Sequence, residues 1–294
     1  MRQAIFLLMV LLAGCQAALP TLPEWQSPQG RDAANLGLIK DLRSGEILTS
    51  TELVERLSAA SQVLVGEQHD NLDHHALELW LLQAMASQRE QGSVLLEMLT
   101  SSQQNAVDHA QKVLRAGQPV ADLTQQLDWQ KGWDWSMYGP IVRYALAQPA
   151  SVLAANLDRT EMMQIYRKQP ALSGPVSTSD AVREPLLEQI RESHCGLLPD
   201  SQMPAMLAVQ QQRDRRMAER LQQASKPAVL LAGAFHVRRD VGVPVHLRDL
   251  NNTATNAVLI LSEVGKPVSA EQADYVWYTA AVEDKDYCAE MRKR

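Results

Sequence analysis

The sequence is short of cysteine, of net positive charge and of long apolar runs, and each shortage argues against a class of protein. Its three cysteines form no C-x-x-C spacing, which argues against a soft metal site. A net charge of −6 without any basic block argues against a nucleic-acid partner. Beyond the N-terminus, no apolar run approaches the length of a membrane-spanning helix. We therefore expect the chain to contact a membrane only through its N-terminus.

The N-terminus has the pattern of a secretion signal. Arg2 precedes an apolar run over residues 5–12, which is too short for a permanent membrane span. The run leads into LAGC, which resembles the lipobox of bacterial lipoproteins, in which the cysteine, here Cys15, carries the lipid. Gln16 in place of an aspartate resembles the sorting pattern for the outer membrane. The alternative is an ordinary signal peptide that contains a chance cysteine.

These features divide the chain into three parts. Residues 1–14 are predicted to be a lipoprotein signal peptide, and residues 15–36, with three prolines and little periodicity, a tether behind the lipid anchor. Residues 37–294 are predicted to form one α/β domain. In an oxidising compartment, the remaining cysteines, Cys195 and Cys288, would form one disulfide.

Short apolar runs alternate with helical patterns along this domain. Strands are predicted at 63–66, 94–98, 151–157, 228–232, 257–261 and 276–281, after a hairpin near residues 38–49 and a helix that Thr51 caps. The middle third, residues 160–225, is almost wholly helical by pattern and is predicted to be an insertion or lid over one sheet edge. Since strands alternate with helices, the predicted fold is α/β, with a mostly parallel central sheet flanked by helices.

Two predicted strands end in the same pattern, a glycine followed three residues later by a histidine. VLVGEQH ends at His69, and AVLLAGAFH ends at His236. Because the ends of parallel strands open on one edge of a sheet, where ligands bind, we expect the two histidines to share a pocket. Glu67 and His75 lie close to the first of them in sequence, and at least one of His74 and His75 is expected to face solvent.

Three further groups of residues are candidates for chemistry. Glu97 lies at the end of the apolar strand SVLLEM, where a lone buried carboxylate is unfavourable. It is expected either to face the same pocket as His69 or to pair with an arginine from the helical region. Aromatic residues are few, yet several gather in WDWSMYGP, which contains Tyr138, and Tyr144 follows six residues after Tyr138. Such a cluster suits a flat ligand, and a tyrosine oxygen can bind ferric iron, although plain packing is the alternative. Arg238 and Arg239 either clamp carboxylates or form a solvated face.

Taken together, these segments resemble the ChaN family of haem-binding bacterial lipoproteins, within the wider Tiki/TraB/erythromycin-esterase superfamily. The matching pieces occur in order between about residues 60 and 250: GEQHDNLDHH, LLEMLTSSQQ, WDWSMYGP, AANLDR, HCGLLP with MLAVQQQRDRRMA, and AGAFHVRRDVGVP. The resemblance implies an α/β fold, a role in iron acquisition, and ferric haem held between the two protomers of a homodimer.

The resemblance also implies roles for particular residues. In that family a tyrosine of one protomer ligates the iron, while a histidine of the other helps to hold the haem. Tyr138 matches this tyrosine best, with Tyr144 as the alternative. The two arginines that follow the second histidine motif suit the haem propionates by their charge. The histidine belongs to the set His69, His75 and His236.

A hydrolase is the competing interpretation, since the wider superfamily contains hydrolases. Its site would use the strand-end residues Glu67, His69, Glu97 and His236. A metal there would activate water, or His69 would act as a general base, although no nucleophile elbow and no standard zinc spacing occur. A third interpretation is an interaction lipoprotein that captures a protein partner. A haem carrier of the outer membrane would also call for a haem receptor there, which the sequence does not identify.

Overall fold

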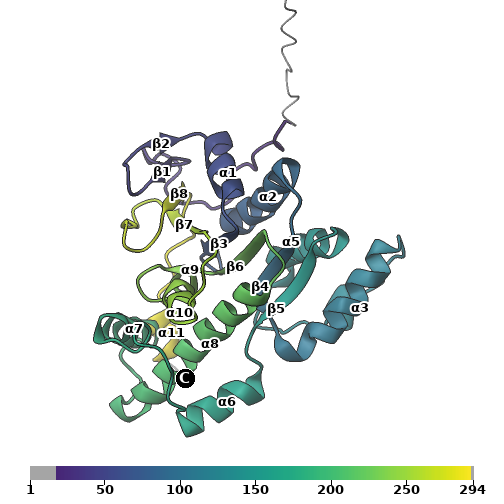
Figure 1. Cartoon of the computed structure of the whole chain (residues 1–294). Helices are drawn as coiled ribbons and strands as arrows, with labels where there is room; N and C mark the ends of the chain where they lie inside the picture. Colours follow the sequence, from purple (N-terminus) through teal and green to yellow (C-terminus); the bar gives the residue numbers. More distant parts are fainter. Residues whose placement is uncertain (1–17, 293–294) are drawn as a thin grey trace, which may run out of the picture.

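An eight-stranded sheet forms the centre of the computed structural model, which describes residues 18–292 (Figure 1). The strand order is β2-β1-β8-β7-β3-β6-β4-β5. Neighbouring strands from β8 to β5 are parallel, while β1 pairs antiparallel with both β2 and β8. The predicted α/β fold with a mostly parallel sheet is therefore confirmed.

The elements follow one another closely along the chain. The strands are β1 (Ile39–Asp41), β2 (Ile47–Leu48), β3 (Gln62–Glu67), β4 (Ser93–Thr100), β5 (Ser151–Asn156), β6 (Ala228–Gly233), β7 (Asn256–Glu263) and β8 (Tyr275–Thr279). The α-helices are α1 (Ser50–Ala59), α2 (Leu72–Gln88), α3 (Gln104–Arg115), α4 (Leu123–Gln126), α5 (Trp135–Ala147), α6 (Arg159–Lys168), α7 (Asp180–Ser193), α8 (Met203–Gln223), α9 (Ala234–Val237), α10 (Val243–Asp249) and α11 (Tyr287–Met291). Short 3-10 turns, η1 (Ser101–Gln103) and η2 (Asp200–Gln202), precede α3 and α8.

The central strands are mostly apolar because helices cover both faces of the sheet. Successive side chains of a strand point to opposite faces. Val63 and Val65 therefore pack with α1, α2, α3 and α5, whereas Leu64 packs with α8 and α10. Burial on both faces explains why these strands read as continuous apolar runs rather than as alternating ones.

The helical middle of the chain does more than cover one edge of the sheet. The C-terminal half of α8 packs on the sheet face through Met217 and Leu221, within the same apolar cluster as Leu64. Its N-terminal half forms a separate apolar cluster with α7. The prediction of helices is confirmed, but α8 is a covering helix of the sheet that also extends beyond its carboxyl edge.

Residues 19–36 do not behave as the free tether that their composition predicts. Leu19 and Trp25 pack against the main apolar cluster, and the indole N–H of Trp80 donates to the carbonyl oxygen of Pro20 at 2.9 Å. The carboxylate of Asp73 accepts the backbone N–H groups of Gln26 and Ser27. The predicted signal peptide and Cys15, the predicted site of lipidation, lie outside the described residues. Within residues 18–292, no helix is long and apolar enough to cross a membrane.

Two local predictions compare directly with the structure. Helix α1 begins two residues earlier than predicted, since Thr49 rather than Thr51 is its cap, in a reciprocal pair of hydrogen bonds with Glu52. Cys195 and Cys288 form a disulfide that joins the end of α7 to α11. The covalent link holds the C-terminal segment against the helices that extend past the sheet.

Gly66 has a packing role that can be tested by substitution. A Cβ at this position would lie 2.9 Å from the backbone Cα of Ala234 and even closer to Val237, so α9 would have to move away from β3. We expect Gly66→Ala to lower the free energy of unfolding by roughly 1–3 kcal/mol, measured by chemical denaturation. Gly132→Ala is the matched control, because nothing lies within 4 Å of the added Cβ. Equal stability of the two variants would contradict this account.

Candidate functional site

A cavity of about 530 Å³ lies at the carboxyl ends of β3, β6 and β7. Both glycine–histidine motifs border it, as their strand-end positions predict. One part of its wall is apolar, formed by Phe235, Ile260, Leu261, Pro267 and Val268. Basic side chains also border it: Arg213, Arg238 and Lys266. This combination suits a ligand that is partly apolar and carries negative charge.

His69 is held by a buried carboxylate that leaves its second ring nitrogen open. Glu67 ends β3 with a fully buried side chain, and its Oε1 lies 2.5 Å from Nδ1 of His69, whose side chain is 48% exposed. Burial opposes charge on the ring, but the hydrogen bond and negative charge of Glu67 outweigh it and raise the pKa of His69. Nε2 has no hydrogen-bond partner within residues 18–292. Such carboxylate–histidine pairs orient histidines that bind metals or transfer protons.

Tyr138 lies behind this pair rather than in the cavity. Its hydroxyl donates to Oε1 of Glu67 at 3.1 Å and lies 3.3 Å from Nδ1 of His69, while its side chain is only 1% exposed. Burial and the charge of Glu67 raise the pKa of Tyr138, which disfavours tyrosinate. The edge of Trp133 packs at 4.9 Å against the His69 ring. In this structure the hydroxyl of Tyr138, which the family resemblance expects to ligate the iron, is buried against Glu67 and does not line the cavity.

Glu97 pairs with an arginine of α8, one of the two arrangements that the sequence left open. It does not itself line the cavity, although Arg213, Gly233 and His236 around it do. Oε1 of Glu97 accepts from Nη2 of Arg213 at 2.5 Å and lies 3.2 Å from Nε2 of His236. Its Oε2 accepts the backbone N–H of Gly233 at 2.8 Å. The charges of His236 and Arg213 outweigh the effect of burial and hold the pKa of Glu97 well below its usual range.

His236 bridges two carboxylates and is therefore not open to a ligand. Its Nδ1 lies 2.5 Å from Oδ1 of Asp214, and its Nε2 faces Glu97. Burial opposes the charged ring, but the two carboxylates raise the pKa of His236 to about 9. Sequence reasoning missed Asp214 and its neighbour Arg213. The segment QQQRDRRMA could have pointed to them, because it places several charged residues on a helix that also packs against an apolar sheet.

The histidines at the start of α2 are both buried, so the expectation that one of them faces solvent is wrong. Nδ1 of His74 accepts the backbone N–H of Gln68, and its Nε2 lies 2.8 Å from the hydroxyl of Thr279. His75 lies beside the strand end of His69, as predicted, and both of its ring nitrogens have partners: the Glu78 carboxylate and the His69 carbonyl. Of the three histidines proposed to support a ligand, His69 alone offers a free nitrogen.

The remaining predicted residues lie apart from the cavity or are already paired. Arg239 pairs with Asp274 and does not line the cavity. Arg238 lines the cavity, but its Nε and Nη2 both donate to Asp240. Tyr144 borders another cavity, of about 380 Å³, beside the first residues of β4 and thus near the amino edge of the sheet. Tyr144 therefore does not meet His69 within one chain.

Fold and cavity together define a ligand-binding α/β protein, and comparison with known proteins gives its family. The chain belongs to the family described as haem-binding uptake, Tiki superfamily, ChaN, whose model matches residues 53–247. The solved structure of ChaN from Campylobacter jejuni, described as showing cofacial haem binding, is 31% identical with a TM-score of 0.76, over 82% of this chain and 95% of that chain. No curated protein matches the chain in sequence.

More distant structures share only a general resemblance. An erythromycin esterase, EreC, is 11% identical with a TM-score of 0.45, over 87% of this chain and 86% of that chain. The RRSP effector domain of Vibrio vulnificus is 15% identical with a TM-score of 0.42, over 82% of this chain and 39% of that chain. Within residues 18–292, no group of three or more His, Cys, Asp or Glu side chains is arranged to hold a metal ion by itself.

Gly233 leaves the space that the ring of His69 occupies. A Cβ there would lie 2.7 Å from Cε1 and 3.0 Å from Nε2 of His69, which is half exposed and can swing outward. We expect Gly233→Ala to separate His69 from Glu67 and so lower the pKa of the ring toward 6.5, measured by NMR titration. Its effect on stability should be smaller than that of Gly66→Ala. An unchanged His69 pKa would show that the glycine is not needed for this contact.

The raised pKa of His236 predicts how the stability of the fold depends on pH. Because the folded pKa is raised from 6.5 to about 9, the stabilisation is fully present below pH 6.5 and is lost as the pH rises through about 9. We expect the melting temperature to fall by several degrees across this range, and His236→Gln to flatten part of the slope. His75, whose pKa is also raised to about 9 by Glu78, would carry much of the rest. A melting temperature that rises between these pH values would overturn the assignment.

Proposed function

We propose that this chain is an outer-membrane lipoprotein that binds haem for iron acquisition, with His69 as the residue that faces the iron. The observation that carries the proposal is the free Nε2 of His69 at the cavity, with Nδ1 held by Glu67. Membership of the haem-binding ChaN family supports haem as the ligand. The anchor at Cys15 rests on the LAGC pattern alone.

The residues around the cavity fit a haem. Phe235, Ile260 and Val268 offer an apolar wall for the macrocycle, and basic side chains stand beside it for the propionates. His69 would supply Nε2 as a nitrogen ligand on release of the proton that its raised pKa favours, with an orienting carboxylate behind it, as metal-binding histidines commonly have. Bound haem would supply an iron centre that accepts such a nitrogen. The ferric state is proposed because the disulfide indicates an oxidising compartment.

A homodimer is part of the same proposal. The cavity belongs to one chain and presents its histidine from one side, so one face of a planar ligand would stay open to a second protomer. The cofacial haem described for ChaN of Campylobacter jejuni supports this arrangement. Tyr144, half-buried on another part of the surface, remains a candidate contact from a partner chain.

A hydrolase is the second candidate function, and a specific observation favours it. A histidine with one nitrogen on a buried carboxylate and the other open to a cavity is also the arrangement of a general base. Ester turnover that is abolished in Glu67→Gln would support this function, whereas a chain without turnover on a broad set of esters would not.

Haem titration followed by absorbance tests the leading proposal. We expect saturable ferric haem binding by the full-length protein in mild detergent, lost or strongly weakened in His69→Ala. Tyr138→Phe should retain binding with a modest change in the spectrum, because the hydroxyl supports Glu67 instead of touching the ligand. Tyr144→Phe, distant from the cavity within one chain, should leave one-to-one binding by a monomer unchanged.

The same titration has outcomes that contradict the proposal. No saturable binding would reject a haem carrier. A tyrosinate charge-transfer band that disappears in Tyr138→Phe, together with unchanged binding by His69→Ala, would return the role of ligand to Tyr138. That result would require α5 to open and expose a side chain that is now buried.

A further inference from the structure

Three basic residues border the cavity, and they differ in how far their donors are already used. Arg238 directs Nε and Nη2 at Asp240 and stacks on Phe235 at 5.3 Å. Lys266, 61% exposed, pairs with Glu263 at 2.6 Å and donates to Gln68. Exposed pairs of this kind are held weakly and cost entropy to fix. Arg238 thus has a carboxylate of its own two residues away, and Lys266 is held only loosely.

Arg213 differs from Arg238 in its carboxylate partner, because Glu97 is fully buried and is shared with His236, whereas Asp240 is partly exposed and takes two donors from Arg238. Nη2 of Arg213 donates to Glu97 at 2.5 Å and its Nε donates to Asn156 at 3.1 Å, so the guanidinium plane is set by two contacts. Its Nη1 has no hydrogen-bond partner within residues 18–292 and is not among the buried atoms that lack one. The side chain is 22% exposed and lines the cavity.

The charge on Arg213 belongs to a cluster of two carboxylates and two cations. Glu97 is shared, since its Oε1 also faces Nε2 of His236. Asp214 is engaged by the other nitrogen of His236 and is fully buried. The two carboxylates and the two cations of this cluster balance in number, so what Arg213 keeps for an incoming anion is the N–H donors of Nη1.

Arg213 and His69 are also connected through Gly233. Glu97, the partner of Arg213, accepts the N–H of Gly233, and the ring of His69 occupies the space that a Cβ on that glycine would take. We propose that Arg213 recognises a carboxylate of the ligand while His69 faces its centre. This inference rests on the proposed haem function and assigns the anion contact to a residue outside the arginine pair that the sequence suggested.

Haem dimethyl ester, which lacks free carboxylates, tests the assignment. In detergent, we expect the full-length protein to bind ferric haem on the order of tenfold more tightly than the diester, since a hydrogen bond between charged groups is worth about that factor. Arg213→Gln should weaken haem binding by a similar factor and leave diester binding unchanged. The diester thus also reports whether the variant retains its fold.

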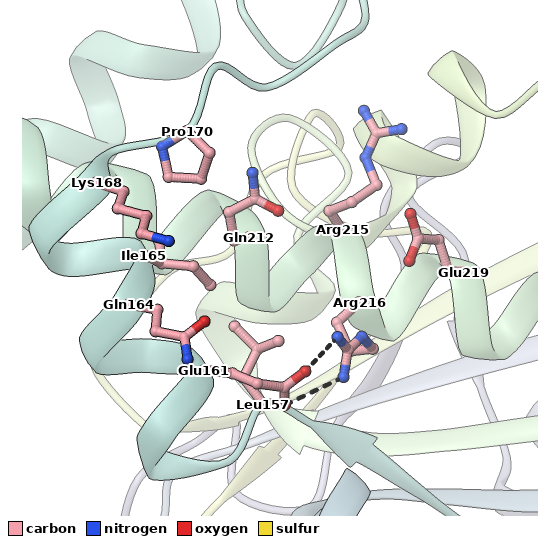
Figure 2. Close-up of a pocket in the computed structure, with 10 residues that line it drawn as sticks. All are labelled: Leu157, Glu161, Gln164, Ile165, Lys168, Pro170, Gln212, Arg215, Arg216 and Glu219. Atoms are coloured by element: carbon pink, nitrogen blue, oxygen red, sulfur yellow. Dashed lines mark hydrogen bonds and ion pairs between the residues drawn. The ribbon is translucent and has the colours of Figure 1, made fainter.

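Arg216→Gln is the matched control on the same helix. Its side chain is 26% exposed, close to that of Arg213, and it pairs with Glu161 at 2.7 Å in a separate cavity between α6 and α8 (Figure 2). We expect it to keep the wild-type preference for haem over the diester. Equal wild-type affinity for the two ligands, or a preference that survives Arg213→Gln, would overturn the role of Arg213 while leaving haem binding intact. Failure of the wild-type chain to bind either ligand would instead reject the proposed function.

Discussion

Two carboxylates with fully buried side chains, Glu67 and Glu97, lie near the carboxyl edge of the sheet, and the need to satisfy them organises the site. Burial of a carboxylate is strongly unfavourable unless hydrogen bonds or opposite charges compensate for it. Glu67 is paired with the ring of His69 and accepts a hydrogen bond from the hydroxyl of Tyr138. Glu97 accepts hydrogen bonds from Arg213 of α8 and from the backbone N–H of Gly233. The functional side chains are therefore held by partners inside the protein.

This arrangement explains why apparently similar histidines have different roles. Both motifs place a histidine three residues after a glycine at a strand end. His69 has one carboxylate partner and keeps a free nitrogen, whereas His236 lies between Glu97 and Asp214 and keeps none. A charged, doubly paired imidazole stabilises its neighbours, while a singly paired one can accept a ligand or a proton. The difference comes from α8, which supplies Asp214 to one histidine only.

The sheet and the location of the site could be predicted from sequence because they depend on local patterns. Continuous apolar runs, such as VLVGE over β3, indicate buried parallel strands, and strand ends indicate where ligands bind. The partners of those strand ends could not be predicted, because they come from distant parts of the chain. Glu97 and Arg213 are separated by 116 residues. Residues 19–36 look like a tether by composition, yet Trp80 and Asp73 fix them through contacts that no local pattern reveals.

The position of Tyr138 has a physical consequence for how the site would choose its ligand. A hydroxyl that donates to a buried carboxylate favours its own neutral form and also holds that carboxylate toward His69. In the proposed haem site, Tyr138 would not compete with His69 for the iron, since of these two side chains only His69 lines the cavity. Replacement of the phenol by a ring of the same size would leave Glu67 with one donor fewer and a stronger hold on the proton of His69. Through its hydrogen bond to Glu67, Tyr138 therefore influences the basicity of the exposed nitrogen of His69, and with it the strength of any bond from that nitrogen to a metal centre.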